Sequence, residues 1–333
     1  MTEPGDDARS DLGLSENPLE ALEWGPARGC LAFRIGEWIL FRVGTDLLRC
    51  RTHFLKIPVL SSPEPPRRLL DERGASGALV PSCPVESPIP RLSRRGGWVR
   101  YATWHYDHQL VRIEGSFSEY EAAMSRKTRE TLRRKVRRFL EEAGGGESFK
   151  MFAGPEEMAV FWEDARKVAG RTYQERLFGE AIPASDSYRE ELIERARRGR
   201  VLGFVLYRRG EPVAYTVGDV VGEGVVLYGY TGYLTELRKL SPGTVLQHLL
   251  IRALFDSGRA RVYDLCVGEA EHKRLFSNES RLAADVYFFR PSLRNRCLVL
   301  GHIAVEGANV FIVKVLDALR IKQVIKRIVR RSA

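Results

Sequence analysis

The feature that most constrains the fold is a set of three apolar, β-branched runs with a helix immediately behind them. The runs are separated by the turns Arg209-Gly210-Glu211 and Gly222-Glu223, and they cover Val201 to Tyr207, Pro212 to Val220 and Gly224 to Thr231. Short glycine turns between such runs predict a meander of three antiparallel strands. Ser241-Pro242-Gly243 then opens a helix over Thr244 to Ser257, and Gly258 ends it. A chain with this order must combine sheet and helix.

Helices and strands are also expected on both sides of the meander. Upstream we expect a helix over Phe117 to Ala143, a strand over Phe149 to Phe152, a helix from Pro155 to about Gln174, and a helix over about Ser187 to Arg198. Downstream we expect a strand at Val262 to Cys266, a short helix around Ala270 to Ser277, and a strand at Ala284 to Phe289. The fold class is therefore α+β (mixed α/β), with a central, mostly antiparallel sheet flanked by helices.

The first third of the chain is less regular. Residues 1–16 are acidic and are expected to be a disordered tail. Strands are expected at Cys30 to Ile35, Trp38 to Val43, Phe54 to Leu60, Trp98 to Trp104 and Gln109 to Ile113. The segment 61–97 is rich in Pro, Arg, Gly and Ser, which predicts a long surface loop or a weakly structured insert.

Composition excludes several classes of protein. The 333 residues are 44% hydrophobic, which suits a large core, and no stretch approaches the roughly 20 apolar residues that a membrane span needs. The N-terminus carries acid where a signal peptide carries base, so we expect a cytoplasmic protein. The five cysteines are widely spaced without a C-x-x-C, which predicts buried, reduced thiols and no metal site.

The start of the helix at Ser241 is the first candidate site. A helix N-terminus offers free N–H groups and a partial positive charge, and so it holds a phosphate well. Gly243 lets a phosphate approach the backbone, Ser241 can cap the helix or bond a phosphate oxygen, and Arg238 and Lys239 add charge. The candidate binding residues are Leu240, Ser241, Pro242, Gly243 and Thr244. The competing interpretation is an ordinary helix start.

The second candidate site follows the strand at Asp264. A carboxylate inside an apolar strand must be paired or functional, because an unpaired buried charge is costly. Glu269, Glu271, His272 and Lys273 crowd the positions after the strand end. In the simpler interpretation, Asp264 pairs with Lys273 or an arginine and only fixes the loop.

Three motifs together resemble a known family. They are Tyr228-Gly229-Tyr230-Thr231-Gly232-Tyr233, then Leu240-Ser241-Pro242-Gly243-Thr244-Val245-Leu246, then Tyr263-Asp264-Leu265 with Gly268-Glu269-x-x-His272-Lys273. With the basic helix that starts at Ser125, they resemble the GNAT acetyltransferases linked to cellulose biosynthesis (CelD type), over about Val111 to Arg290. Two departures from that pattern stand out: His272 replaces a Tyr, and Cys266 and Val267 replace small or polar residues.

The resemblance implies direct acyl transfer from acetyl-CoA or another acyl-CoA to an amine or hydroxyl, such as a cell-envelope or polysaccharide precursor. A base takes a proton from the acceptor while backbone N–H groups polarise the thioester carbonyl. The candidate bases are Asp264 and Glu269, with His272 third; Lys273 completes this site, and Tyr230 is a candidate acid for the leaving thiolate. No covalent acyl-enzyme is expected, since no Ser-His-Asp or Cys-His motif is visible.

The same resemblance relates the chain to the Fem-type transferases, which carry two GNAT-like domains. It implies a degenerate first GNAT-like half over 17–115, a linking basic helix over 116–145, a catalytic domain over 146–291, and a basic helical tail over 292–333. Two other functions stay open: an aminoacyl-tRNA-dependent Fem-like transferase, and a non-catalytic binding module with the GNAT fold.

The net charge of +10 is concentrated in two helical segments. The first, from Arg126 to Arg138, carries Arg129, Arg133 and Arg137 in one column of like charge. It is a solvated face, a contact for an acidic acceptor such as tRNA or a nucleotide-linked sugar, or a contact for the donor phosphates. The second is the tail from Val310 to Arg331, which we expect to pack on its own domain, with at most weak contact to a membrane surface.

Overall fold

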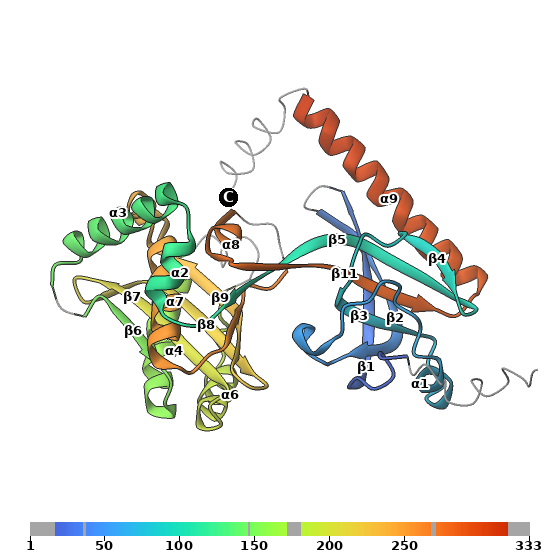
Figure 1. The fold of residues 1–333 in the computed structure, drawn as a ribbon, viewed down its shortest axis with the longest axis horizontal. Coiled ribbons are helices and arrows are strands. Elements are labelled where there is room, and N and C mark those ends of the chain that lie inside the picture. Colours follow the sequence, from blue (N-terminus) through green and yellow to red (C-terminus); the bar gives the residue numbers. More distant parts are fainter. Residues whose placement is uncertain (1–16, 36–37, 146, 172–180, 268–270, 319–333) are drawn as a thin grey trace, which may run out of the picture. The chain divides into compact units, whose positions relative to one another are not determined.

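The computed structural model describes residues 17–35, 38–145, 147–171, 181–267 and 271–318 (Figure 1). The expected acidic tail lies outside them. The chain divides into two compact units. Unit 1 comprises residues 1–106 together with 282–333, and unit 2 comprises residues 107–281. The strand expected at 284–289 therefore belongs to unit 1, whereas the sequence predicts it in the domain over 146–291.

Unit 2 is built on a sheet in the order β6-β7-β8-β9-β10-β5. These strands are β6 (Phe149–Phe152), β7 (Val201–Arg208), β8 (Glu211–Val221), β9 (Val225–Tyr233), β10 (Val262–Asp264) and the last residues of β5 (Trp98–Arg112). The pairs from β6 to β9 and the pair of β10 with β5 are antiparallel, whereas β9 and β10 are parallel. The meander and the α+β class are confirmed.

Helices cover both faces of this sheet. On β7 and β8, a Cβ added at Gly203 would touch the Phe161 ring of α4 (Pro155–Ala169), whereas Thr216 accepts a hydrogen bond from Gln247 of α7 (Pro242–Ser257). Gly203 pairs with Val217, the neighbour of Thr216, and successive residues of a strand point to opposite faces. The helices α4 and α7 therefore lie on opposite faces. The other helices among the described residues of unit 2 are α2 (Phe117–Ala123), α3 (Arg126–Ala143), α6 (Asp186–Arg197), the 3₁₀ helix η2 (Thr235–Leu240) and the short α8 (Glu271–Phe276).

The single helix expected over Phe117 to Ala143 is wrong, because the chain breaks it at Met124 and Ser125. Met124 is extended, with φ −71° and ψ 153°. The Ser125 side chain then accepts the Thr128 N–H and caps α3, just as Ser116 accepts the Glu119 N–H and caps α2. Two serine caps nine residues apart thus begin two helices, α2 and α3.

Unit 1 contains β1 (Trp24–Ile35) and β2 (Trp38–Cys50), which form an antiparallel ribbon, followed by β3 (Gly77–Pro84) and β4 (Leu92–Arg95). Its other elements are η1 (Phe54–Lys56), α1 (Arg67–Glu72), the first part of β5, β11 (Glu279–Phe289) and α9 (Leu293–Ala318). The strand β3 pairs with β2 in parallel and with β11 in antiparallel orientation.

Three expectations for unit 1 are wrong. Residues 61–97 are no structureless insert, because they hold α1, β3 and β4, and Ala78 and Val80 of β3 are fully buried. Phe54 to Leu60 begins as a 3₁₀ helix and not as a strand. Trp98 to Trp104 and Gln109 to Ile113 are not two strands, since β5 runs unbroken from Trp98 to Arg112.

The helical tail is confirmed as far as Ala318, and the rest lies outside the described residues. Val299 of α9 is buried with Leu31 and Phe33 of β1, and the Tyr101 hydroxyl contacts His302 Nδ1 at 2.7 Å. None of the described helices is long and apolar enough to cross a bilayer. Cys50 and Cys83 are buried free thiols as expected, but Cys297 on α9 is exposed.

Candidate functional site

A gap opens in the sheet of unit 2 where β9 continues past the end of β10. The last pair between these strands joins Asp264 to Leu227, and β9 runs on to Tyr233. Within the described chain, no strand pairs with the β10-facing edge of β9 beyond Leu227. On its other edge β9 bulges, because Gly229 and Tyr230 together oppose Val217 of β8. Tyr228 at the start of this stretch accepts from the Cys266 thiol, and beyond it the edge of β9 has no partner strand among the described residues.

A cavity of about 380 Å³ lies beside this stretch, at the N-terminus of α7. Its lining comes from β9, from the loop before α7 and from the first turns of α7, and it comprises Tyr228, Thr231, Gly232, Tyr233, Arg238, Ser241, Pro242, Gly243, Thr244 and Gln247. Four of the five residues predicted for phosphate binding thus line one cavity. The fifth, Leu240, is buried and packs in the hydrophobic core.

The backbone at the start of α7 is arranged differently from a capped helix. Ser241 has φ 54° and ψ 47° and makes no side-chain capping bond, so of the two roles expected for its hydroxyl only the bond to a phosphate oxygen stays a prediction. A left-handed serine is strained, and such strain is typical of ligand-binding turns. Gly243 keeps the cavity open, because a Cβ there would lie 3.3 Å from the Tyr233 ring. The first N–H groups of α7 therefore have no capping side chain from Ser241.

A chain of polar side chains runs from the cavity lining, at Thr231 and Gln247, into the core. Tyr263 donates to Gln247 at 3.1 Å, Gln247 donates to Thr216 at 3.4 Å, and Thr216 contacts Thr231 at 2.9 Å. These four residues come from β10, α7, β8 and β9, so the chain ties the start of α7 to the strands around the gap. Because each group is satisfied, the network fixes the geometry of the cavity at little cost in stability.

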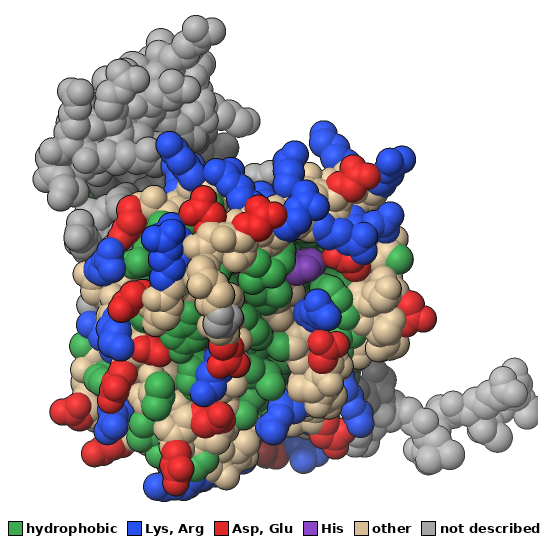
Figure 2. All heavy atoms as spheres, turned by 90° about the vertical axis from the view of Figure 1, so that its left-hand side faces the viewer, with side chains coloured by type: hydrophobic (Ala, Val, Ile, Leu, Met, Phe, Trp, Pro, Cys, Tyr) green, Lys and Arg blue, Asp and Glu red, His purple; other side chains and the backbone are tan. Residues whose placement is uncertain are grey.

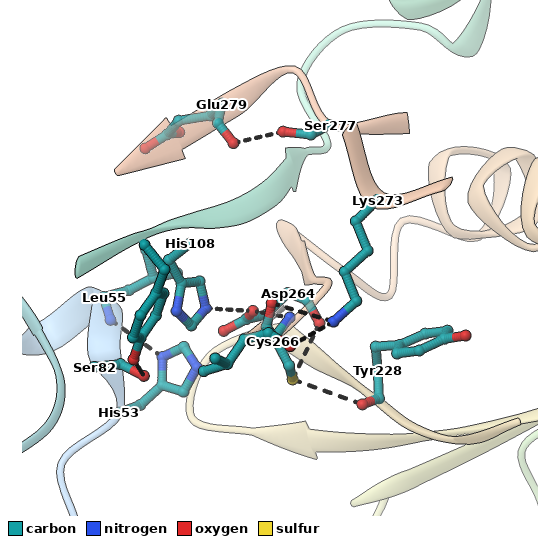
Figure 3. Close-up of polar contacts among 12 residues, drawn as sticks. His53, Leu55, Ser82, His108, Tyr228, Asp264, Cys266, Lys273, Ser277 and Glu279 are labelled. Atoms are coloured by element: carbon teal, nitrogen blue, oxygen red, sulfur yellow. Dashed lines mark hydrogen bonds and ion pairs between the residues drawn. The ribbon is translucent and has the colours of Figure 1, made fainter. Parts of the chain in front are cut away.

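Asp264, predicted from its apolar strand, pairs with His108 (Figure 3). The His108 Nε2 and the Cys266 backbone N–H each lie 2.7 Å from Asp264 Oδ1. Asp264 and His108 are 2% and 4% exposed. A carboxylate this buried and this well bonded is suited to positioning the strand end, not to collecting a proton from solvent. His108 was missed from the sequence, where it looks like one more polar residue of β5.

Lys273, the partner expected for Asp264, instead holds the loop that follows β10 (Figure 3). Its ammonium donates to the Val267 carbonyl at 2.7 Å and to the Cys266 carbonyl at 3.5 Å, and it lies over the Tyr228 ring. Burial lowers the pKa of the Lys273 ammonium, while Cys266 and Asp264 raise it. Asp264 and Lys273 therefore both bond to the backbone of the same turn, in which Cys266 has a left-handed conformation. Burial raises the pKa of the Cys266 thiol to about 12, which keeps it protonated.

The other predicted catalytic residues are less closely gathered. Tyr230 lies on β9 and is 39% exposed, with its ring edge-on to Tyr188 of α6 at 6.0 Å. Glu269 lies outside the described residues. His272 lies in α8, and its side chain is likewise outside what the structure describes.

Three arginines of the basic helix α3 form ion pairs with glutamates of the same protein. Arg126 and Arg137 bond glutamates one turn further along α3, and Arg133 bonds Glu121 of α2, which is buried. These pairs relieve part of the like-charge column expected from the sequence. Figure 2 shows basic side chains gathered along the upper edge of the face that carries α3. A shallow cavity of about 740 Å³ lies against α2, α3 and α7, and its charged side chains largely pair with one another.

Comparison with known proteins shows what part of this chain is similar to. Residues 126–274 match the family model described as "Acetyltransferase (GNAT) domain", and no curated protein matches the chain. Similar solved structures include the C-terminal domain of a putative lysylphosphatidylglycerol synthetase from Agrobacterium fabrum, with 12% identity, 72% of this chain and 75% of that chain covered, and a TM-score of 0.48. The structure of L-PGS from Bacillus licheniformis has 15% identity, covers 70% and 74%, and has a TM-score of 0.45. FemX has 12% identity, covers 83% and 90%, and has a TM-score of 0.45.

These identities and TM-scores are too low to transfer a substrate to this chain. The family match covers the meander, α7, the cavity at its N-terminus and the turn after β10. Residues 126–274 are therefore similar to a GNAT acetyltransferase domain.

Proposed function

We propose that unit 2 transfers an acyl group from acyl-CoA to an amine or hydroxyl. The observation that carries this proposal is the cavity at the N-terminus of α7, open to the unpaired edge of β9. The cofactor joins a pyrophosphate to a long amide-containing arm. A helix N-terminus suits the first part, and an unpaired strand edge suits the second, because its N–H and C=O groups can bond the amides.

Each part of the donor has residues that suit it. The N–H groups of the first turn of α7 and the Arg238 guanidinium are proposed to bind the pyrophosphate. The edge of β9 beyond Leu227 is proposed to bind the pantetheine amides, which brings the thioester toward the bulge at Gly229 and Tyr230. A backbone N–H there would polarise the thioester carbonyl.

The acceptor is proposed to attack the thioester carbonyl directly. The acceptor nitrogen or oxygen forms the new bond to the acyl carbon, the carbon–sulfur bond breaks, and Tyr230 supplies a proton to the leaving thiolate. Burial and bonding give Asp264 a positioning role here, together with His108 and Lys273. Glu269 and His272 stay the candidates for the base that takes the acceptor proton. The family resemblance favours a cell-envelope or polysaccharide precursor as the acceptor.

Aminoacyl transfer from tRNA is the second candidate, and the surface of α3 favours it. Among the described residues, Arg134 and Arg138 of α3 are exposed and have no ion-pair partner. Unpaired exposed arginines on one helix attract a polyanion, and such binding weakens steeply as salt rises. A binding module without activity is the third candidate.

Thermal unfolding of the full chain with CoA, acetyl-CoA and tRNA separates these functions. A ligand at 100 times its Kd stabilises the folded state by about 2.7 kcal/mol, so CoA should raise the Tm clearly. Gly243→Asp places a carboxylate beside the Tyr233 ring, where the pyrophosphate is expected, and should abolish the shift. Gly307→Asp is the matched control, because nothing lies within 4 Å of the Cβ added there. A CoA shift that survives in Gly243→Asp contradicts the proposed site, and a salt-sensitive shift with tRNA alone favours the second candidate.

A further inference from the structure

The ribbon formed by β1 and β2 in unit 1 exposes an apolar end. The strand β2 pairs with β3 only through Leu48 and Arg49, so the rest of the ribbon continues with two strands (Figure 1). Near its turn, Ile39, Leu40 and Phe41 are 37%, 52% and 51% exposed. Successive residues of a strand point to opposite faces, so both faces of the ribbon are open to solvent at this end. Large apolar side chains that are exposed together in this way mark a site of contact with another molecule or a membrane.

Basic side chains flank this apolar end. Arg34 and Arg42 are exposed on either side of the turn, and between Arg28 and Arg42 the sequence holds three arginines against one acid, Glu37. A cluster of apolar residues framed by arginines matches the boundary of an anionic bilayer, where apolar side chains enter the acyl region and guanidinium groups meet phosphates.

The helix α9 packs against the same ribbon. His302 Nε2 contacts the Ala32 carbonyl of β1 at 3.2 Å, and Val299 of α9 is buried with Leu31 and Phe33. The apolar side chains at Ile39 to Phe41 nevertheless stay exposed.

We propose that the end of the β1–β2 ribbon, Ile39 to Phe41 with Arg34 and Arg42, docks unit 1 on the surface of an anionic lipid bilayer. A second protein chain fits less well, because three half-exposed side chains offer far less than the roughly 800 Å² per partner of a stable protein interface. A bilayer requires no such area, since each apolar side chain contributes separately on entering it. This proposal goes beyond acyl transfer and does not depend on it.

Sedimentation of the full chain with lipid vesicles tests the proposal. We expect the protein to sediment with vesicles of phosphatidylcholine mixed with phosphatidylglycerol, and much less with vesicles of phosphatidylcholine alone. Leu40→Ser and Phe41→Ser should each weaken binding about tenfold, which corresponds to about 1.4 kcal/mol per tenfold step. The control is Val160→Ser, which removes a side chain 51% exposed on α4 of unit 2 and should leave binding unchanged. Arg34→Gln with Arg42→Gln should remove most of the preference for anionic vesicles.

Several results would overturn the proposal. Equal binding of the Leu40→Ser/Phe41→Ser variant and the parent chain would show that the ribbon end does not enter the bilayer. Absence of vesicle binding together with a dimer that dissociates in this variant would assign the ribbon end to a protein interface. Because Phe41 stacks on the Phe33 ring, whose centroid is 4.4 Å away, thermal unfolding of each variant is measured in parallel. Leu40→Ser alone decides the matter if the Phe41 variant is less stable.

Discussion

Replacing Asp264 by leucine tests how strongly the buried pair with His108 holds the end of β10. The substitution keeps the number of side-chain heavy atoms but removes the acceptor of two hydrogen bonds, from His108 Nε2 and from the Cys266 N–H, both 2.7 Å long. Each buried donor that loses its acceptor costs about 1–3 kcal/mol, which sets a range of about 2–6 kcal/mol. Leucine carries no charge, so its burial costs no desolvation of a charged group. We therefore expect the free energy of unfolding to fall by about 3 kcal/mol.

Urea unfolding followed by circular dichroism measures this loss of unfolding free energy. In thermal unfolding, the Tm should fall by about 6–12 °C for a unit of this size. Asp264→Asn is the matched variant, because its Oδ1 can still accept both bonds and only the charge is lost; about 1 kcal/mol is expected. Lys273→Met loosens the same turn, so its loss combined with Asp264→Asn should be smaller than the sum of the two. An Asp264→Leu variant as stable as the parent chain would refute the assigned role of the pair.

Three further predictions concern packing and pH. Gly203→Ala should cost about 1–3 kcal/mol of stability in urea unfolding, because the added Cβ would lie 2.5 Å from the Phe161 ring, and Gly307→Ala is the neutral or stabilising control. A chain that ends at Pro291 lacks α9 and should bind an apolar dye and melt earlier, since Leu31 and Phe33 lose their cover; unchanged melting would contradict a docked tail. Burial lowers the pKa of His302, so the unfolded chain takes up a proton below about pH 6.5 that the folded chain does not. Stability should therefore fall as the pH drops from about 6.5 toward the lowered pKa of His302, and His302→Gln should reduce that slope in urea midpoints measured across this range.

The regular part of unit 2 could be predicted from the sequence because its signals are local. The meander has its glycine turns within the segment, and α7 begins at Ser-Pro-Gly and ends at Gly258. The break between α2 and α3 was missed because the apolar periodicity continues across it, and only the extended backbone of Met124 divides the two. The strand β3 was missed for the opposite reason, since its short apolar core is set among Pro, Arg and Ser.

The candidate site was only partly predictable, because its partners are distant in sequence. The N-terminus of α7 and Asp264 both stand out as local exceptions to the pattern around them. His108 does not stand out, because its role depends on a bond to Asp264, which lies 156 residues away in the sequence. The bonds that Lys273 makes could not be predicted, since sequence spacing cannot show that the turn at Cys266 directs two carbonyls toward its ammonium.

The division of the chain into units also affects how the protein can fold during synthesis. Unit 1 is discontinuous, and β3 pairs with residues 283–289 of β11, which follow all of unit 2. At a synthesis rate of about 5–20 residues per second, the ribosome needs roughly 9–35 s to make the intervening segment. Until then, the edge of β3 that will receive β11 has no partner, whereas unit 2 can complete its own sheet first. A ribosome-bound chain stalled after Arg281 should therefore hold a protease-resistant unit 2 behind an N-terminal segment that is still protease-sensitive.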